Sequence, residues 1–234
     1  YYTSATIILA RDPDTGRENA SFHRMMFLGG NRFAVRIVPR DLYDFYQRNR
    51  ERGKDTDVAV ICGVHPAIAL AAATSYPDLN ELELANSILG GGLKCVSIGG
   101  IDVPSDAEVV MLGRIMRNMV AEEGPFVDLT GTWDTVRSEP VLIVDKVYMK
   151  TDPIWQVILP GGVEHRLLMG ITQEPRMYRF IKNTVPSVQN VVLTNGGCGW
   201  LHAVVSIKKR AEGDGKNAGV AALAAHPSLK MVIV

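Results

Sequence analysis

Two acidic side chains flank a Gly-Pro-Phe turn near the middle of the chain. The segment is Glu123-Gly124-Pro125-Phe126-Val127-Asp128, in which Gly-Pro favours a tight, stiff bend. Such a bend can hold both carboxylates on one side of a rigid loop, which is the arrangement that proton-transfer chemistry requires. An exposed acidic loop between two strands is the alternative, and these six residues alone favour it.

An early strand offers these acids a cationic partner. Asn19 and Arg24 lie five residues apart in a segment that predicts a strand from about Ala20 to Leu28. An odd spacing places two side chains on opposite faces of a regular strand. Their convergence therefore requires a bulge, or a site formed where the strand begins, and a surface position is the ordinary explanation for Arg24 alone.

The elements that must position these residues are mostly strands in the first two thirds of the chain. Alternating and β-branched residues bounded by turn signals predict a meander, and helical spacing of Leu42, Phe45, Tyr46 and Asn49 predicts a helix that ends at Gly53. The predicted strands cover residues 3–10, 20–28, 33–38, 57–62, 93–98, 107–112 and 140–149, and further helices cover 66–74 and 81–89.

The remainder of the chain has a different pattern. It predicts helices over 176–183 and 216–225 and strands over 188–194, 200–208 and 230–234, which indicates a βαβ unit with a parallel sheet. We therefore expect two domains, 1–165 and 166–234. The chain starts without methionine and ends on the apolar segment 231–234, so we expect a fragment of a longer protein.

Composition excludes several classes of protein. Of 234 residues, 47% are hydrophobic and 21% charged, which argues against disorder. Lys plus Arg equals Asp plus Glu at 25 each, so bulk charge does not favour a nucleic-acid partner. Cys62, Cys95 and Cys198 share no metal-binding spacing. With no signal peptide and no apolar stretch of membrane-spanning length, we expect a cytoplasmic protein with free thiols.

Further short motifs occur in order along the chain: Pro39-Arg40-Asp41, Ser75-Tyr76-Pro77, Glu81, Leu93-Lys94-Cys95-Val96, Val103-Pro104 and Ala107-Glu108-Val109-Val110. Together with Asn19, Arg24 and the acidic turn, they resemble the UbiD family of decarboxylases, which use prenylated FMN. The resemblance spans nearly all of the chain.

The resemblance implies an α+β fold, with a split β-barrel flavin-binding domain followed by the beginning of an α/β domain. It implies non-oxidative decarboxylation, with its reversibility left open, of an aromatic or α,β-unsaturated carboxylic acid. Two alternatives remain: a non-catalytic flavin- or phosphate-binding subunit of a carboxylase complex, and a decarboxylase of a phosphorylated isoprenoid-pathway acid. The implied partners are the small carboxylic acid, a flavin prenyltransferase that supplies the cofactor, and further copies of the full-length chain in a homo-oligomer.

The resemblance also assigns roles to residues. Arg24 would bind the substrate carboxylate, Glu123 would hold Arg24, and Asp128 would return the proton after carbon dioxide leaves. Mn²⁺ would be held by Asn19, Asp41 and Glu81, and K⁺ by backbone carbonyls near Ala20, Thr74 and Tyr76. The residues implied in cofactor binding are Asn19, Ala20, Ser21, Phe22, His23, Arg24, Thr74, Ser75, Tyr76 and Pro77.

Three positions differ from the family pattern. Asp41 stands where the family usually has a histidine ligand, and it is either a metal ligand or the N-cap of the helix that follows Pro39. Val127 replaces a usual glycine. The segment before Glu81 is short, which leaves Glu83 as an alternative ligand.

Overall fold

The computed structural model describes all residues from 1 to 234. The chain forms two compact units. The first comprises Tyr1–Ala73, Pro77–Val127 and Trp133–Leu159, and the second comprises Thr74–Tyr76, Asp128–Thr132 and Pro160–Val234.

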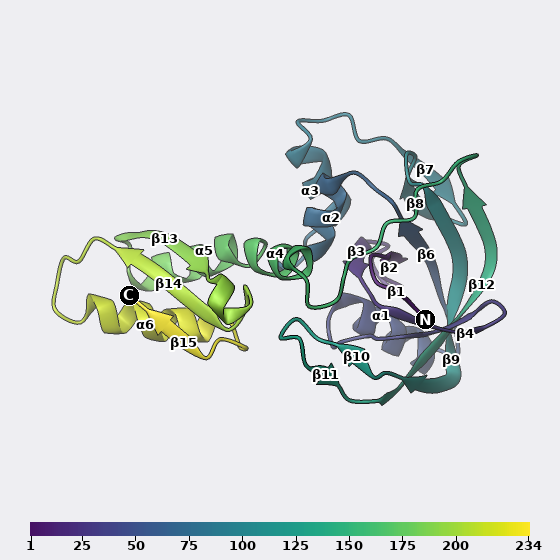
Figure 1. Cartoon of the computed structure of the whole chain (residues 1–234). Coiled ribbons are helices and arrows are strands. Elements are labelled where there is room, and N and C mark those ends of the chain that lie inside the picture. The colour runs from purple at the N-terminus through teal and green to yellow at the C-terminus, as the bar shows by residue number, and fades with distance from the viewer. The chain divides into compact units, whose positions relative to one another are not determined.

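An eight-stranded antiparallel sheet dominates the first unit, in the order β1-β4-β5-β12-β9-β6-β2-β3 (Figure 1). Its strands are β1 (Tyr2–Thr3), β2 (Ile7–Arg11), β3 (Glu18–Phe22), β4 (Met25–Gly29), β5 (Arg32–Val35), β6 (Thr56–Cys62), β9 (Val109–Glu123) and β12 (Arg137–Met149). Two small hairpins, β7–β8 (Cys95–Ile98 and Ile101–Pro104) and β10–β11 (Phe126–Val127 and Trp133–Asp134), and the helices α1 (Asp41–Glu51), α2 (Pro66–Ala73) and α3 (Glu81–Ile88) complete it.

The neighbouring strands β2 and β6 are buried on both faces. In β2, Ile8 joins a core with Phe45 of α1, whereas the neighbouring Ile7 joins a second core with Ile68 of α2. Alternate residues of a strand point to opposite faces, so β2 and β6 must be apolar at nearly every position. Each large aliphatic side chain buried in this way contributes about 1.5–3 kcal/mol.

The segment predicted as one strand over 20–28 is two strands. β3 and β4 lie near opposite ends of the sheet order, and the chain passes from one to the other at His23 and Arg24. There the His23 amide donates to the Thr6 carbonyl oxygen (3.1 Å) and the Thr6 hydroxyl donates to the His23 carbonyl oxygen (3.0 Å). The sheet curls at this point, and strand parity therefore does not relate Asn19 to Arg24.

Other segments also differ from the sequence prediction, among them the strand expected over 3–10, which is divided into β1 and β2. β9 was expected to end near residue 112 but continues to Glu123, paired along its length with β12. Its later part is mostly exposed and mixes polar with apolar residues, so it lacks the buried apolar run by which a strand is recognised in the sequence. A helix, α4 (Val163–Ile171), was not predicted.

The second unit contains α4, α5 (Glu174–Thr184), β13 (Val188–Leu193), a short 3₁₀ turn η1 (Asn195–Gly197), β14 (His202–Ile207), α6 (Asp214–Ala225) and β15 (Met231–Ile233). β14 and β15 are parallel, as the predicted βαβ unit requires. β13 pairs with β14 in the antiparallel sense, because the short turn between them cannot cross over.

The molecule is a mixed α+β protein with a curled antiparallel sheet, in agreement with the predicted class. None of its helices combines the length and apolar character needed to cross a bilayer. All three cysteines are free thiols.

Candidate functional site

Arg24 and Glu123 form a buried ion pair in the first unit. Arg24 Nε and Nη2 donate to the two carboxylate oxygens of Glu123, both at 2.9 Å. Glu123 is 0% exposed and the Arg24 side chain 14% exposed. Arg24 reaches this position because it lies in the break between β3 and β4, and Glu123 because it is the last residue of β9. The sequence prediction that Glu123 holds Arg24 therefore has a matching contact.

Two aromatic rings enclose this pair. The Arg24 guanidinium lies over the Phe126 ring, 4.4 Å from its centroid, and the Tyr2 ring packs on Phe126 at 4.7 Å. The Tyr2 hydroxyl donates to Glu123 Oε1 at 2.9 Å. Burial, and then this contact with Glu123, raises the pKa of Tyr2 to about 12. Tyr2 therefore stays a hydrogen-bond donor to the carboxylate at neutral pH.

A second carboxylate, that of Asp134, binds the same arginine. Asp134 Oδ2 accepts from Arg24 Nη2 at 3.0 Å, and Asp134 Oδ1 accepts from Arg137 Nη2 at 2.9 Å. Burial by itself would raise the pKa of Asp134, but hydrogen bonds from Arg24 and the Thr135 amide outweigh it and keep that pKa below its usual value. Burial also opposes the charge of Arg24, yet its bonds to both acids raise the guanidinium pKa.

Sequence reasoning missed Asp134. A usable signal was present, because the glycine at position 131 marks a turn that closes the β10–β11 hairpin. In that hairpin Phe126 pairs with Asp134, so the register alone brings Asp134 back beside the acidic turn.

Asp128 lies in the turn that joins β10 to β11 and is exposed. Its carboxylate accepts from the Leu129 amide at 2.7 Å, and its own amide donates to the Thr132 carbonyl oxygen. These bonds make the turn compact. The residue belongs to the second compact unit, and its role as a proton donor stays a prediction.

Asn19 and Glu81, two of the predicted metal ligands, are hydrogen-bonded to each other, and their role in holding a metal stays a prediction. Asn19 Nδ2 donates to Glu81 Oε1 at 3.1 Å, and the Ala20 amide donates to Glu81 Oε2 at 3.0 Å. Both side chains are buried. Burial raises the pKa of Glu81 to about 7, and the nearby charge of Asp41 acts in the same direction.

Asp41 is not the N-cap of α1, so that interpretation is wrong. The N-cap is Arg40, and Asp41 is the first residue inside the helix. Its carboxylate instead accepts from Arg17 Nη2 at 2.9 Å, and Arg17 Nη1 donates to the Leu79 carbonyl oxygen. The role of Asp41 as a metal ligand stays a prediction.

A chain of side-chain contacts runs from Asn19 along β3. The Ser21 hydroxyl lies 3.0 Å from Asn19 Oδ1 and 2.9 Å from His23 Nε2, and His23 Nδ1 lies 2.9 Å from the Arg36 carbonyl oxygen. Burial lowers the pKa of His23 to about 4, so the ring is neutral at pH 7. Phe22 packs against the core shared with α2 and α3.

The second predicted cofactor-binding segment follows α2. Thr74, Ser75 and Tyr76 belong to the second unit and Pro77 to the first. Within the second unit, the Arg179 guanidinium lies 5.9 Å from the centroid of the Tyr76 ring. The contribution of this segment to cofactor and K⁺ binding stays a prediction.

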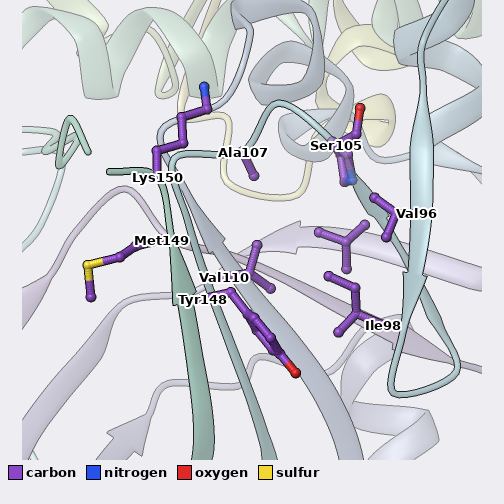
Figure 2. A pocket seen from close by; sticks show the side chains of 10 residues that line it. Val96, Ile98, Ser105, Ala107, Val110, Tyr148, Met149 and Lys150 are labelled. Carbon is purple, nitrogen blue, oxygen red and sulfur yellow. The ribbon is translucent and has the colours of Figure 1, made fainter. Parts of the chain in front are cut away.

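The first unit also has an open cavity of about 200 Å³ at the β7–β8 hairpin (Figure 2). Its walls are mostly apolar and include Ile98, Val110 and Tyr148, with Lys150 at one end. The Lys150 amine is bound to Glu108 at 2.8 Å. None of the predicted site residues lines this cavity. It is therefore separate from the cluster of Arg24, Glu123, Asp134 and Tyr2 (the Arg24 cluster).

The buried oxygen atoms of Asn19 and Glu81 fit a hard divalent cation such as Mn²⁺, which prefers carboxylate and amide oxygens. A cation would also favour the ionised form of Glu81, which burial disfavours. No three His, Cys, Asp or Glu side chains gather in the chain as a metal site. A cation here would therefore depend on Asn19 and on ligands such as a phosphate.

The chain is similar to several named decarboxylases. It is 55% identical over 235 residues to the anhydromevalonate phosphate decarboxylase of Methanothermobacter thermautotrophicus, covering 100% of this chain and 56% of that protein. Two solved structures of the UbiD-class enzyme HmfF from Pelotomaculum thermopropionicum are each 36% identical and cover 99% of this chain. One, in complex with FMN, has a TM-score of 0.96 and is covered over 53% of its chain. The other, an evolved dimeric form in complex with prFMN, has a TM-score of 0.95 and is covered over 55%.

The chain thus spans about half the length of the relatives it matches. The model of the 3-octaprenyl-4-hydroxybenzoate carboxy-lyase Rift-related domain matches residues 1–163, and that of the C-terminal domain of the same carboxy-lyase matches residues 166–234. This chain belongs to the UbiD family.

Proposed function

We propose that this chain is part of a prenylated-FMN-dependent decarboxylase that acts on a phosphorylated α,β-unsaturated carboxylic acid. The observation that carries the proposal is the buried Arg24–Glu123 pair, with both guanidinium–carboxylate bonds at 2.9 Å. The choice of acid comes from the 55% identical relative, whose name specifies anhydromevalonate phosphate. This substrate class replaces the aromatic acid as our first choice.

Arg24 is the residue that binds the substrate carboxylate. Its Nη1 makes no hydrogen bond within the protein and is free to donate to an anion. Glu123 fixes the opposite edge of the guanidinium, so that the direction of Nη1 is set before substrate arrives. Such preorganised charge stabilises bound anions at no further cost in ordering.

The proton balance assigns the remaining role. When the bond between the carboxyl carbon and the α-carbon breaks, carbon dioxide leaves and the electron pair stays on the organic fragment. Prenylated FMN, when bound, supplies the electron sink for that pair. A proton must then reach the carbon that lost carbon dioxide, and Asp128 is the proposed donor.

The cofactor-binding role rests on β3 and α3. Asn19 and Glu81 would hold Mn²⁺, with Asp41 as the third candidate ligand, and the carbonyls near Ala20, Thr74 and Tyr76 would hold K⁺. A split-barrel flavin-binding function for the first unit is part of this proposal. So are a full-length homo-oligomer, supply of the cofactor by a flavin prenyltransferase, and a cytoplasmic location.

The test of function is reconstitution. The full-length protein, produced with a flavin prenyltransferase, should show the absorption spectrum of bound modified flavin and should release carbon dioxide from anhydromevalonate phosphate in preference to 4-hydroxybenzoate. Asp128→Asn should retain the bound flavin and lose turnover. Normal turnover by this variant would remove Asp128 from the donor role. Bound flavin with no turnover of any acid would favour a non-catalytic subunit.

The metal assignment has its own matched pair of variants. Glu81→Gln should lower bound manganese at least tenfold, because a charged and buried oxygen ligand is lost. Glu83→Gln, on the exposed side of the same helix, should leave manganese unchanged. Elemental analysis of the two purified proteins checks this, and the reverse result would transfer the ligand role to Glu83.

A further inference from the structure

Asp134 occupies part of the surface of Arg24 that an incoming carboxylate needs. A guanidinium has five N–H donors. Nε and one N–H of Nη2 are used by Glu123, and the other N–H of Nη2 is used by Asp134 at 3.0 Å. Only the two N–H groups of Nη1 remain without a partner in the protein.

Strong recognition of a carboxylate by arginine uses two parallel N–H groups on one edge of the guanidinium. Glu123 fills the edge formed by Nε and Nη2. The edge formed by Nη1 and Nη2 is half filled, because Asp134 takes the Nη2 donor. A substrate carboxylate can therefore form its second bond to Arg24 only if Asp134 releases Nη2.

A second arginine, Arg137, already binds Asp134 and can keep its carboxylate paired after it leaves Arg24. Arg137 Nη2 binds Asp134 Oδ1 at 2.9 Å, and Arg137 Nη1 is anchored on the Thr135 hydroxyl at 2.6 Å. The Asp134 side chain is 23% exposed, so a shift toward Arg137 would not leave its charge buried and unpaired. The four charges of Arg24, Glu123, Asp134 and Arg137 balance, and an added substrate anion competes directly with Asp134.

We propose that Asp134 is an internal competitor for the substrate carboxylate: it covers Arg24 Nη2 in the free protein and moves onto Arg137 when substrate binds. Asp134 thereby sets the affinity of the site for carboxylates. This inference rests on the proposed function, because it requires that Arg24 bind the substrate carboxylate.

The test compares a carboxylate with its neutral amide. Binding of 3-methylcrotonate and of 3-methylcrotonamide is measured by calorimetry on the full-length protein loaded with unmodified FMN, so that no turnover occurs. Asp134→Asn removes the competing charge and should tighten binding of the carboxylate about fivefold, the size of one partly exposed ion pair. Binding of the amide should not change.

Asp145→Asn is the matched control. Asp145 also accepts two hydrogen bonds from an arginine, Arg114, at 3.1 and 3.2 Å, but on an exposed part of the sheet. This variant should bind both probes like the parent. Arg137→Met removes the arginine that pairs with the displaced Asp134. It should weaken carboxylate binding, which is the opposite of the effect expected for Asp134→Asn.

Kinetics with the prenylated cofactor provides a second readout. In Asp134→Asn the KM for anhydromevalonate phosphate should fall about fivefold with kcat within about twofold of the parent. Weaker or unchanged carboxylate binding in Asp134→Asn, or a loss confined to kcat, would overturn the inference and make Asp134 a support for Arg24. Arg24→Met tests separately whether Arg24 binds the substrate carboxylate. If it binds the carboxylate like the parent, the assignment of Arg24 fails as well, whereas a loss of binding leaves that assignment standing.

Discussion

Replacing Glu123 by glutamine removes one negative charge from the centre of the Arg24 cluster while keeping the side chain's size. Three donors converge on this carboxylate at 2.9 Å: Arg24 Nε, Arg24 Nη2 and the Tyr2 hydroxyl. The glutamine side chain has one oxygen that can accept hydrogen bonds. Its nitrogen is itself a donor and would face a guanidinium N–H, with which it cannot form a hydrogen bond. At least one buried donor therefore loses its partner.

The expected loss of stability follows from burial. Removing one partner of a buried ion pair costs about 3–5 kcal/mol, because the remaining charge is left without compensation. Asp134 still binds Arg24 at 3.0 Å and is partly exposed, which places the loss at the lower end. We expect the free energy of unfolding of the first unit to fall by about 3 kcal/mol, equivalent to a decrease in Tm of roughly 6–12 °C.

Chemical unfolding followed by circular dichroism measures this loss. Glu122→Gln is the matched control, because Glu122 is the neighbouring residue of β9 and is exposed. It should change the free energy of unfolding by less than about 0.5 kcal/mol. A double-mutant cycle with Arg24→Met should give a coupling energy of at least about 2 kcal/mol. A loss below about 1 kcal/mol in Glu123→Gln, or zero coupling, would refute the claim that this pair is a buried and organising contact.

Two further predictions concern the frame of the site. Gly113→Ala should destabilise the protein by about 3 kcal/mol in the same unfolding assay, because a Cβ there would lie 2.2 Å from the Ile143 carbonyl oxygen of β12. Gly215→Ala, in an open part of α6, should instead stabilise by about 0.5 kcal/mol, and similar effects of both changes would contradict the close approach of β9 and β12. The second prediction is a pH dependence: burial lowers the pKa of His23 to about 4, whereas in the unfolded chain a histidine titrates near pH 6.5. Protons therefore bind the unfolded state first, and the stability that is complete above about pH 6.5 is lost as pH falls toward 4, by up to about 3 kcal/mol. His23→Gln should remove this component from a pH series of unfolding curves and His65→Gln, at an exposed loop residue, should retain it; equal slopes in the two variants would exclude His23 as the cause.

Most of the helices and the buried strands β2 and β6 were predictable because their signals are local. Leu42, Phe45 and Tyr46 lie on one face of α1 and enter one core, and their spacing in the sequence already indicates that face. The apolar run of β2 likewise predicts a strand buried on both sides. The small-residue helix α6 between two apolar strands predicts the parallel pair β14–β15.

The missed features are those that depend on partners far away in the chain. The break at His23 and Arg24 is stabilised by hydrogen bonds to Thr6, and it is required because β3 and β4 occupy distant positions in the sheet. Neither feature is visible in the local sequence pattern. The last part of β9 is mostly exposed and mixes polar with apolar residues, yet pairing with β12 still extends the strand to Glu123. Local propensity could not predict either result.

For the candidate site, the sequence by itself determined which residue types are present and in what order, and so the family, the arginine, the acidic turn and the pair Asn19 and Glu81. Only the tertiary structure decided which carboxylates meet Arg24. Glu123 and Asp134 lie 99 and 110 residues away from it along the chain. Their meeting depends on where β9 ends and on the register of the β10–β11 hairpin, and a strand register is decided by long-range pairing and packing, not by local sequence.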